Sequence, residues 1–251
     1  MNRMAPWLGL VAGLLLATPA AADPDLLLSQ TRLVLEGSDL EGELTVANTG
    51  TETLVFDARM VERSMDAYGN LYPSEISRPP WAAAPYVRFA PHQFTLEPGQ
   101  LQVIRFLQGP RVPEGELRSH LQISAAAAER TFRITVPVIV RRGHVQSRVR
   151  LQAARPQLAP DGLWHSELML EREGTASIFG DVEYWLNCPD QARVKLATRR
   201  GVAVYAQNAE RKFSFSFAIP SSATAGCLVN ALFRNREPVP TFAGAATTAV
   251  L

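Results

Sequence analysis

Residues 131–143 read TFRITVPVIVRRG, and this stretch decides the fold class. Apolar side chains alternate with polar ones along it: Phe132, Ile134, Val136 and Val138 against Arg133 and Thr135. A period of two indicates a β-strand with one apolar face. Pro137 cannot donate a hydrogen bond to a ladder, so it favours a position on a sheet edge. The stretch therefore predicts an edge strand with a row of large apolar side chains, which edge strands normally avoid.

The same alternation recurs along most of the chain. QFTLEPGQLQVIRFL at 93–107 predicts two strands joined by a turn with Pro98 and Gly99 at its centre, and this order fits a type II turn. KFSFSFAIP at 212–220 places three phenylalanines on one face and two serines on the other. No long stretch has helical spacing with capping signals. Short strands with Pro and Gly punctuation predict an all-β protein of antiparallel sandwiches.

The first residues predict an export signal. MNRM carries one arginine, an apolar stretch follows, and TPAAAD ends it with small residues, so cleavage is expected between Ala22 and Asp23. No later segment is long and apolar enough to span a membrane, and we expect a soluble exported protein without membrane insertion after cleavage. The predicted organisation is listed by residue range: 1–22 signal peptide, 23–142 first domain, 143–148 linker and 149–251 second domain.

Composition excludes some classes of function. The formal net charge is +1, with 47% hydrophobic and 20% charged residues, which lacks the basic bias of a nucleic-acid binder. The two cysteines, Cys188 and Cys227, both lie in the second half of the chain. Outside the cell's reducing interior they are predicted to form a structural disulfide, because the C-x-x-C spacing of a redox or zinc site is absent.

The residues of catalytic and metal sites are not grouped in this sequence. The four histidines, His92, His120, His144 and His165, are far apart and read as scattered surface residues. No phosphate-binding loop, nucleophile elbow or zinc-protease motif occurs. We therefore predict no enzyme activity, no catalytic residues, no metal and no cofactor.

Several segments together resemble the periplasmic pilus-assembly chaperones of the chaperone–usher pathway, the PapD-like proteins. The segments, in chain order, are SQTRLVLEGSDLEGELTVANTG at 29–50, VRFAPHQFTLEPGQLQVIRFL at 87–107, EGELRSHLQIS at 114–124 and TFRITVPVIVRRG at 131–143. The R-S-H-L and P-V-I-V-R pieces are most similar to the variety associated with archaic or spore-coat-like pili. A thinner match, LEREGTASIFGDVEYW at 170–185, extends into the second half.

The resemblance implies two immunoglobulin-like sandwiches in series, arranged as an L, in a chaperone of the periplasm. Its partners would be pilus subunits that lack their last strand, and an outer-membrane usher to which the subunits are delivered. The chaperone lends its own edge strand to the open groove of the subunit. The side chains expected to fill that groove are Phe132, Ile134 and Val136. The unpaired apolar edge would also allow a second copy to cap it, giving a self-capped homo-oligomer.

The resemblance also implies a site for the terminal carboxylate of the subunit. Arg32 stands where the family has a first-strand arginine, and a guanidinium offers a planar fork that matches a carboxylate. The second anchoring residue of the family is a lysine, but Thr135 occupies that position here. Arg118 and Arg133 are the nearby candidates, and the sequence leaves the choice between them open.

Two other classes of function remain as alternatives. One is a structural or adhesive surface protein of two immunoglobulin-like modules, or a component of the pilus itself. A subunit of that kind would carry an apolar N-terminal extension, and Asp23-Pro24-Asp25 leads almost at once into the first strand. The other is an exported hydrolase on a sandwich, for which the sequence offers no catalytic set.

Overall fold

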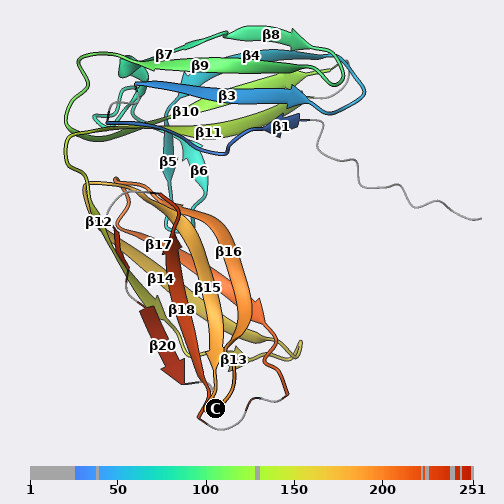
Figure 1. Ribbon diagram of the computed structural model, residues 1–251, viewed down its shortest axis with the longest axis vertical. Coiled ribbons are helices and arrows are strands. Elements are labelled where there is room, and N and C mark those ends of the chain that lie inside the picture. The colour runs from blue at the N-terminus through green and yellow to red at the C-terminus, as the bar shows by residue number, and fades with distance from the viewer. Residues whose placement is uncertain are drawn as a thin grey trace, which may run out of the picture.

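The computed structural model describes residues 26–37, 40–127, 131–221, 223, 226–237, 241–243 and 245–249. The predicted signal peptide lies outside these residues. Two β-sandwich domains follow one another and meet at an angle, so that the molecule has the shape of an L (Figure 1). The predicted fold class, two immunoglobulin-like antiparallel sandwiches in series, is confirmed. No helix in the described ranges is long and apolar enough to cross a membrane.

The first domain packs two sheets around one core. The strands of the first sheet, in spatial order, are β1 (Leu26–Leu28), β3 (Glu41–Asn48), β9 (Leu101–Gln108) and β7 (Val87–Ala90). Those of the second are β2 (Leu33–Glu36), β11 (Thr131–Arg142), β10 (Gly115–Ala126), β4 (Leu54–Val61) and β8 (Gln93–Leu96). A single 3-10 turn, η1 (Ala84–Tyr86), precedes β7. The inner faces supply a shared apolar core that includes Leu44, Phe56, Ile104 and Leu121.

A short hairpin leaves the first domain and reaches into the angle between the domains. Its strands are β5 (Arg63–Met65) and β6 (Leu71–Pro73), which pair with each other in a separate two-stranded sheet. The hairpin continues from the end of β4 and points toward the second domain (Figure 1). At its tip, Asp66 accepts hydrogen bonds from the backbone amides of Tyr68 and Asn70.

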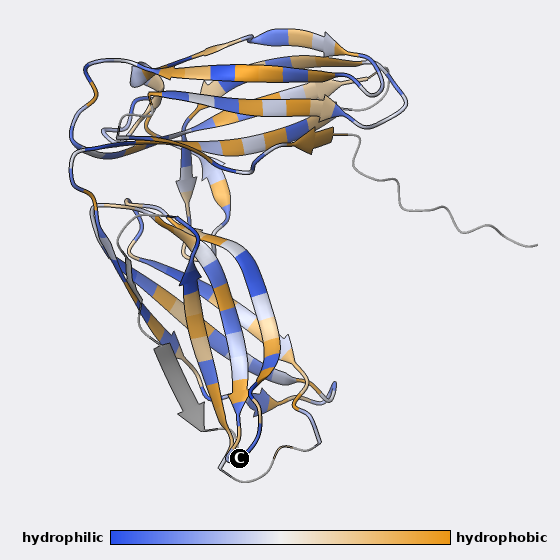
Figure 2. Cartoon of the chain, viewed as in Figure 1, coloured by the Kyte–Doolittle hydropathy of each residue, from blue (hydrophilic) through white to orange (hydrophobic). Residues whose placement is uncertain are grey.

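The second domain repeats the sandwich design. One sheet contains β12 (Ser147–Ala153), β13 (Gln157–Leu158), β14 (Trp164–Gly174), β17 (Glu210–Phe217) and β19 (Thr241–Ala243). The other contains β16 (Val194–Val204), β15 (Ile178–Asn187), β18 (Leu228–Asn235) and β20 (Ala245–Ala249). Apolar residues alternate with polar ones along the strands of both domains (Figure 2). The Cys188–Cys227 disulfide is present and joins the residue after β15 to the residue before β18.

The edge of the second sheet of domain one is only partly covered. β11 pairs with β10 along its whole length, from Arg142 opposite Gly115 to Thr131 opposite Ala126. On its other side, β2 runs parallel to β11 and covers only 138–141. The chain before β2 crosses to the opposite sheet, where β1 pairs with β3. Within the described part of the chain, residues 131–137 therefore have a neighbouring strand on one side only.

Candidate functional site

The open part of β11 carries the three side chains predicted to enter a partner. Phe132 and Ile134 are half-buried and pack against the apolar core of their own domain. Val136 is 1% exposed and belongs to that core, as does Val138. The apolar surface that β11 leaves accessible at its open edge therefore comes from Phe132 and Ile134, while Val136 stabilises the domain itself.

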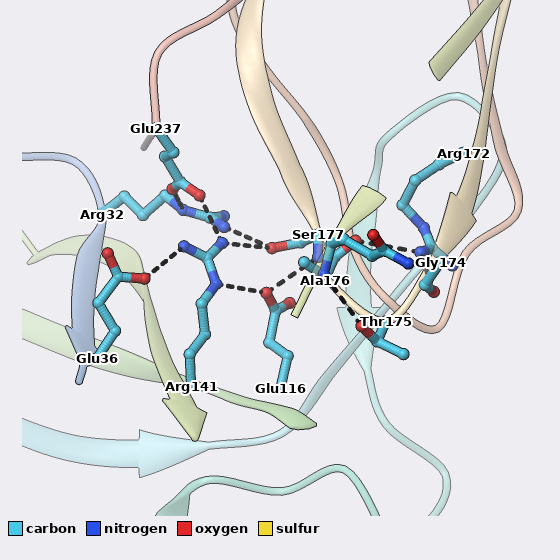
Figure 3. A network of polar contacts seen from close by, with 11 residues as sticks. Arg32, Glu36, Glu116, Arg141, Arg172, Gly174, Thr175, Ala176, Ser177 and Glu237 are labelled. Atoms are coloured by element: carbon cyan, nitrogen blue, oxygen red, sulfur yellow. Dashed lines mark hydrogen bonds and ion pairs between the residues drawn. The ribbon is translucent and has the colours of Figure 1, made fainter. Parts of the chain in front are cut away.

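The junction between the domains forms a second site, built around Arg32. Arg32 lies just before β2 and is 7% exposed, although arginine side chains normally remain in water. Its Nε donates to the Glu237 carboxylate, and its Nη2 donates to Ser177 Oγ at 2.6 Å (Figure 3). The guanidinium also lies 5.3 Å from the ring centre of Phe179. Arg32 is thus held by three residues of the second domain.

Arg141, at the end of β11, is the centre of the ion-pair network in Figure 3. Its Nε is 2.8 Å from Glu116, its Nη2 is 2.5 Å from Glu237 and its Nη1 is 3.2 Å from Glu36. Burial lowers the pKa of Arg141, but the Glu116 and Glu237 carboxylates outweigh burial and hold the pKa above its ordinary value. The backbone amide of Ser177 donates to Glu116 at 2.9 Å. The network joins both domains through charged side chains that are mostly buried.

Arg172 positions the turn from which Ser177 reaches the network. Its guanidinium donates to four carbonyl oxygens, those of Gly174, Ala176, Ala206 and Asn208, at 2.7–3.1 Å. Five fixed donors make arginine suited to binding several carbonyls at once. Burial lowers the pKa of Arg172 relative to its ordinary value, with a smaller opposing effect from Glu116. Arg172 therefore fixes the backbone that presents Ser177 to both Arg32 and Arg141.

Arg118 lies beside Arg32, on the face of Tyr205. The Arg118 guanidinium carbon is 3.9 Å from the centre of the Tyr205 ring, and that of Arg32 is 5.9 Å away. Arg118 is 2% exposed and donates through Nη2 to the carbonyl oxygen of Arg63 at 2.7 Å. Arg133, by contrast, is exposed on the open part of β11, and Thr135 is half-buried there. Of the two candidates, Arg118 is the one that the fold brings to Arg32.

His120 corrects the prediction that all four histidines lie on the surface. His92, His144 and His165 are exposed, but His120 is fully buried. It projects from the outer face of β10, and its ring meets that of Tyr205 edge-on, with 5.8 Å between the centroids. Burial and the neighbouring cations, Arg118 foremost, lower its pKa to about 3. The reason for the error is that this sheet face, which would be solvated in a single domain, is covered by the second domain.

Most of the network is not evident from the sequence. Arg141, Glu116 and Ser177 lie in segments that resemble the family, but the sequence assigns them no role, and Glu237 lies in none of these segments. The available signal was the position of Arg141 at the end of a strongly apolar strand, next to the start of a second domain. An arginine at that position can form a buried ion pair, but only the fold shows that its partners are the carboxylates of residues 36, 116 and 237.

No protein-family model and no curated protein matches the sequence. Among solved structures, the chain is similar to one from the CsuC–CsuE chaperone–tip adhesion subunit pre-assembly complex of archaic chaperone–usher Csu pili of Acinetobacter baumannii. That match has 12% identity and a TM-score of 0.48, and covers 88% of this chain and 97% of that one. The Pseudomonas aeruginosa CupB2 chaperone gives 15% identity, a TM-score of 0.46, and 90% and 100% coverage.

A chain of the Salmonella enterica complex of the SafA pilin with the SafB chaperone gives 13% identity and a TM-score of 0.45. It covers 92% of this chain and 99% of that one. These likenesses have TM-scores below 0.5. The function proposed below rests on the sequence resemblance and on the geometry of this chain.

Proposed function

We propose that this chain is a periplasmic chaperone that binds pilus subunits by adding its own strand β11 to them, and then delivers them to an outer-membrane usher. The observation that carries the proposal is the edge at 131–137, which β2 does not cover and along which Phe132 and Ile134 remain half-buried. An edge of this kind is a template for another chain, and natural proteins usually protect it. Here it is left to a partner whose sandwich lacks one strand.

The energetics favour such a partner over a solvated edge. Full burial of one large apolar side chain contributes about 1.5–3 kcal/mol, and β11 offers two that are only partly buried. Backbone hydrogen bonds along the ladder add affinity with little dependence on sequence. Part of this gain offsets the loss of freedom on association.

The test is co-expression with a candidate subunit, chosen from the source genome as an exported chain that fits an immunoglobulin-like fold lacking its last strand. Phe132→Ser combined with Ile134→Ser should reduce both the amount of subunit in the periplasm and its co-purification with the chaperone at least tenfold. Val55→Ser combined with Leu101→Ser is the matched control, because both side chains are exposed elsewhere on the same domain. Unchanged binding by the Phe132/Ile134 variant would refute the strand-addition mechanism.

We further propose that Arg32 and Arg118 bind the terminal carboxylate of the subunit. Arg32 Nη1 and Arg118 Nε and Nη1 have no hydrogen-bond partner among the described residues, although all three atoms are buried. Buried polar atoms without partners are costly, and a carboxylate would supply acceptors to them. Arg32 Nε already donates to Glu237. The carboxylate of the subunit would therefore accept from the donors of Arg32 and Arg118 that have no partner.

Substitution of Arg118 distinguishes carboxylate binding from strand addition. Arg118→Gln should weaken binding of the wild-type subunit but not of a subunit whose C-terminus is amidated, because an amide no longer pairs with the guanidinium. Isothermal titration of the free chaperone with C-terminal subunit peptides, acid and amide, measures the difference. Equal affinity of both peptides for the wild-type chaperone would eliminate the carboxylate site and leave strand addition standing.

A further inference from the structure

The outward face of β10 carries three buried polar side chains, here called the outward row. Arg118, His120 and Gln122 follow one another at every second position of the strand, so they point to the same face of the sheet. They are 2%, 0% and 2% exposed. The core of domain one takes the alternate residues Leu117 and Leu121 instead. The outward row is therefore buried by elements that lie outside the sandwich.

The outward row is rich in polar atoms that lack partners. In the part of the chain that the structure describes, five of its buried atoms have no hydrogen-bond partner: Arg118 Nε and Nη1, both ring nitrogens of His120, and Gln122 Nε2. A buried polar atom without a partner keeps the full penalty of leaving water. Covering this row is therefore costly, and a ligand with matching hydrogen-bonding groups would remove that cost.

The β5–β6 hairpin closes over the outward row. The carbonyl oxygen of Arg63, in β5, accepts from Arg118 Nη2 at 2.7 Å, and Arg63 Nη2 donates to Gln122 Oε1 at 2.7 Å. His120 lies between these two residues in the row, so Arg63 spans the row from end to end. Tyr205 of the second domain covers it as well, with its ring centre 3.9 Å from the Arg118 guanidinium carbon and 5.8 Å from the centre of the His120 ring.

A few contacts attach the hairpin to the second domain. Asn208 Nδ2 donates to the carbonyl oxygen of Met65 at 2.8 Å, and the backbone amide of Lys212 donates to that of Ala67 at 2.6 Å. The Met65 side chain is buried in a small cluster that includes Tyr205. These contacts hold the hairpin in the angle between the domains (Figure 1).

The junction between the domains is held more firmly than the hairpin. Arg32 and Arg141 both pair with Glu237 of the second domain, and Glu116 accepts from the backbone amide of Ser177. Moving the second domain away from the row would break these buried ion pairs, which is strongly unfavourable. Moving the hairpin breaks only the few contacts given above. The hairpin is therefore the covering element that can leave while the domains keep their angle.

We infer that the outward row binds the carboxyl-terminal end of the subunit, and that the β5–β6 hairpin is a cover that opens to admit it. This inference rests on the proposed function and deepens it, because it adds His120 and Gln122 to the carboxylate site and explains how a peptide reaches buried guanidinium atoms. The row spans about 13 Å, the length of about four residues of an extended peptide. The closed cover occupies the place that the peptide takes, so the two compete.

This competition predicts a gain of affinity when the cover is loosened. Asn208→Ala removes the side-chain bond to Met65. In calorimetric titration of the full chaperone with the C-terminal acid peptide of the candidate subunit, the variant should bind about three- to tenfold tighter, because the open state is more populated. Gln30→Ala is the matched control, since Gln30 Nε2 likewise donates to a backbone carbonyl, that of Glu43 in β3. Unchanged or weaker binding by the Asn208 variant would refute the cover, because a permanent brace gains nothing when loosened.

Hydrogen exchange measures the cover without any substitution. The backbone amide of Lys212 is bonded to the hairpin, so its exchange should be faster by about threefold or more at saturating peptide. The amide of Asn48, which donates to the carbonyl oxygen of Gln100 at 2.9 Å in domain one, is the reference and should not change. Slower or unchanged exchange at Lys212 in the complex would overturn the cover.

His120→Phe tests the outward row itself. Phenylalanine keeps an aromatic ring beside Tyr205 but removes both nitrogens, so the acid and amide peptides should both bind about threefold more weakly or worse, with unchanged circular dichroism. His92→Phe, the same substitution at an exposed histidine of the same domain, should bind as wild type does. Unchanged affinity of the His120 variant would refute binding by the row.

The same measurements separate this inference from the proposed function. If Phe132→Ser/Ile134→Ser loses the whole subunit while the Asn208 and His120 variants bind peptide as wild type does, strand addition stands, and the row and its cover are refuted. If acid and amide peptides bind the wild type equally but both variants behave as expected, the row stands and the carboxylate proposal is refuted. If the wild type binds neither peptide, the carboxylate proposal and this inference both fail.

Discussion

Arg141 is the residue on which the junction between the domains most depends. Its side chain is 2% exposed and contacts Glu116, which is fully buried, and Glu237, which is 9% exposed. Buried ion pairs gain little over apolar packing, but removing one partner leaves uncompensated charge in a medium of low dielectric constant. The network therefore specifies how the domains meet more than it adds to overall stability.

Arg141→Ala should lower the free energy of unfolding by about 3–5 kcal/mol, because the buried Glu116 carboxylate loses its cation and Glu237 keeps only Arg32. Urea titration followed by circular dichroism measures the change. Arg105→Ala is the control, since the Arg105–Glu43 pair is mostly exposed, at 79% and 59%, and should contribute less than about 1 kcal/mol. If both variants lost a similar amount of unfolding free energy, burial would not explain the importance of the Arg141 ion pairs.

His120 should make stability depend on pH. In the folded protein its pKa is about 3, whereas an unfolded histidine titrates near 6.5, so the unfolded chain binds more protons between these values. Stability is then greatest above about pH 6.5 and falls as the pH drops toward 3. Between pH 7 and pH 5 the loss from this residue is about 2 kcal/mol.

The substitution His120→Phe should remove that loss. Neither ring nitrogen of His120 has a hydrogen-bond partner among the described residues, so phenylalanine should be tolerated at pH 7. Urea unfolding at pH 7 and at pH 5 compares the variant with wild type. His144→Gln, at an exposed position, should keep the wild-type pH dependence. If the His120→Phe variant kept the wild-type pH dependence of stability, groups other than His120 would dominate the sensitivity to acid.

At the scale of single elements, β11 shows what periodicity can and cannot predict. Alternation and Pro137 predicted an apolar edge strand, because both follow from local backbone geometry. They could not predict that β2 covers 138–141, since that pairing depends on where the chain crosses between sheets. For the same reason Val136 had the pattern of an accessible side chain but lies in the core.

The disulfide acts on the second domain alone. It connects Cys188 and Cys227 across a sequence separation of 39 residues, next to strands β15 and β18. Closing a loop of this length restricts the unfolded chain and stabilises the fold by up to about 4 kcal/mol. The double variant Cys188→Ser/Cys227→Ser should therefore unfold at lower urea concentration.

Fluorescence of tryptophan distinguishes the domains in that experiment. Trp164 and Trp185 belong to the second domain, and Trp81 belongs to the first. With Trp81 replaced by phenylalanine in both proteins, the urea transition reports the second domain, and it should move to lower urea in the cysteine variant. An unchanged transition would mean that the crosslink has no effect on stability. Reducing the wild-type protein should reproduce the shift.

At the scale of the whole molecule, the angle between the domains was predicted only through a family resemblance. Composition and alternation yield two sandwiches, yet the contacts that set the angle join residues far apart in sequence. Arg32 meets Ser177 and Glu237, and Met65 meets Tyr205. No local pattern encodes such pairs, and so the sequence predicts His120 on the surface and assigns no role to Arg141.

The open edge should also make the free protein associate with itself. Two copies can pair their 131–137 edges and cover Phe132 and Ile134, in an interface in which each copy presents the same surface. Seven residues a side is a small interface, so we expect dimers only at high micromolar concentration. Sedimentation velocity over 5–500 μM, roughly the range in which such weak complexes form, measures this.

Ile134→Lys should keep the protein monomeric at every concentration, since lysine on an edge strand opposes pairing with another edge. Leu107→Lys is the control, because Leu107 is exposed on the other sheet and its substitution leaves the β11 edge unchanged. If the Ile134 variant dimerises as wild type does, the copies associate through another surface. If the wild type stays monomeric and still binds the subunit, the edge accepts only a strand-lacking partner, which would separate subunit binding from self-capping.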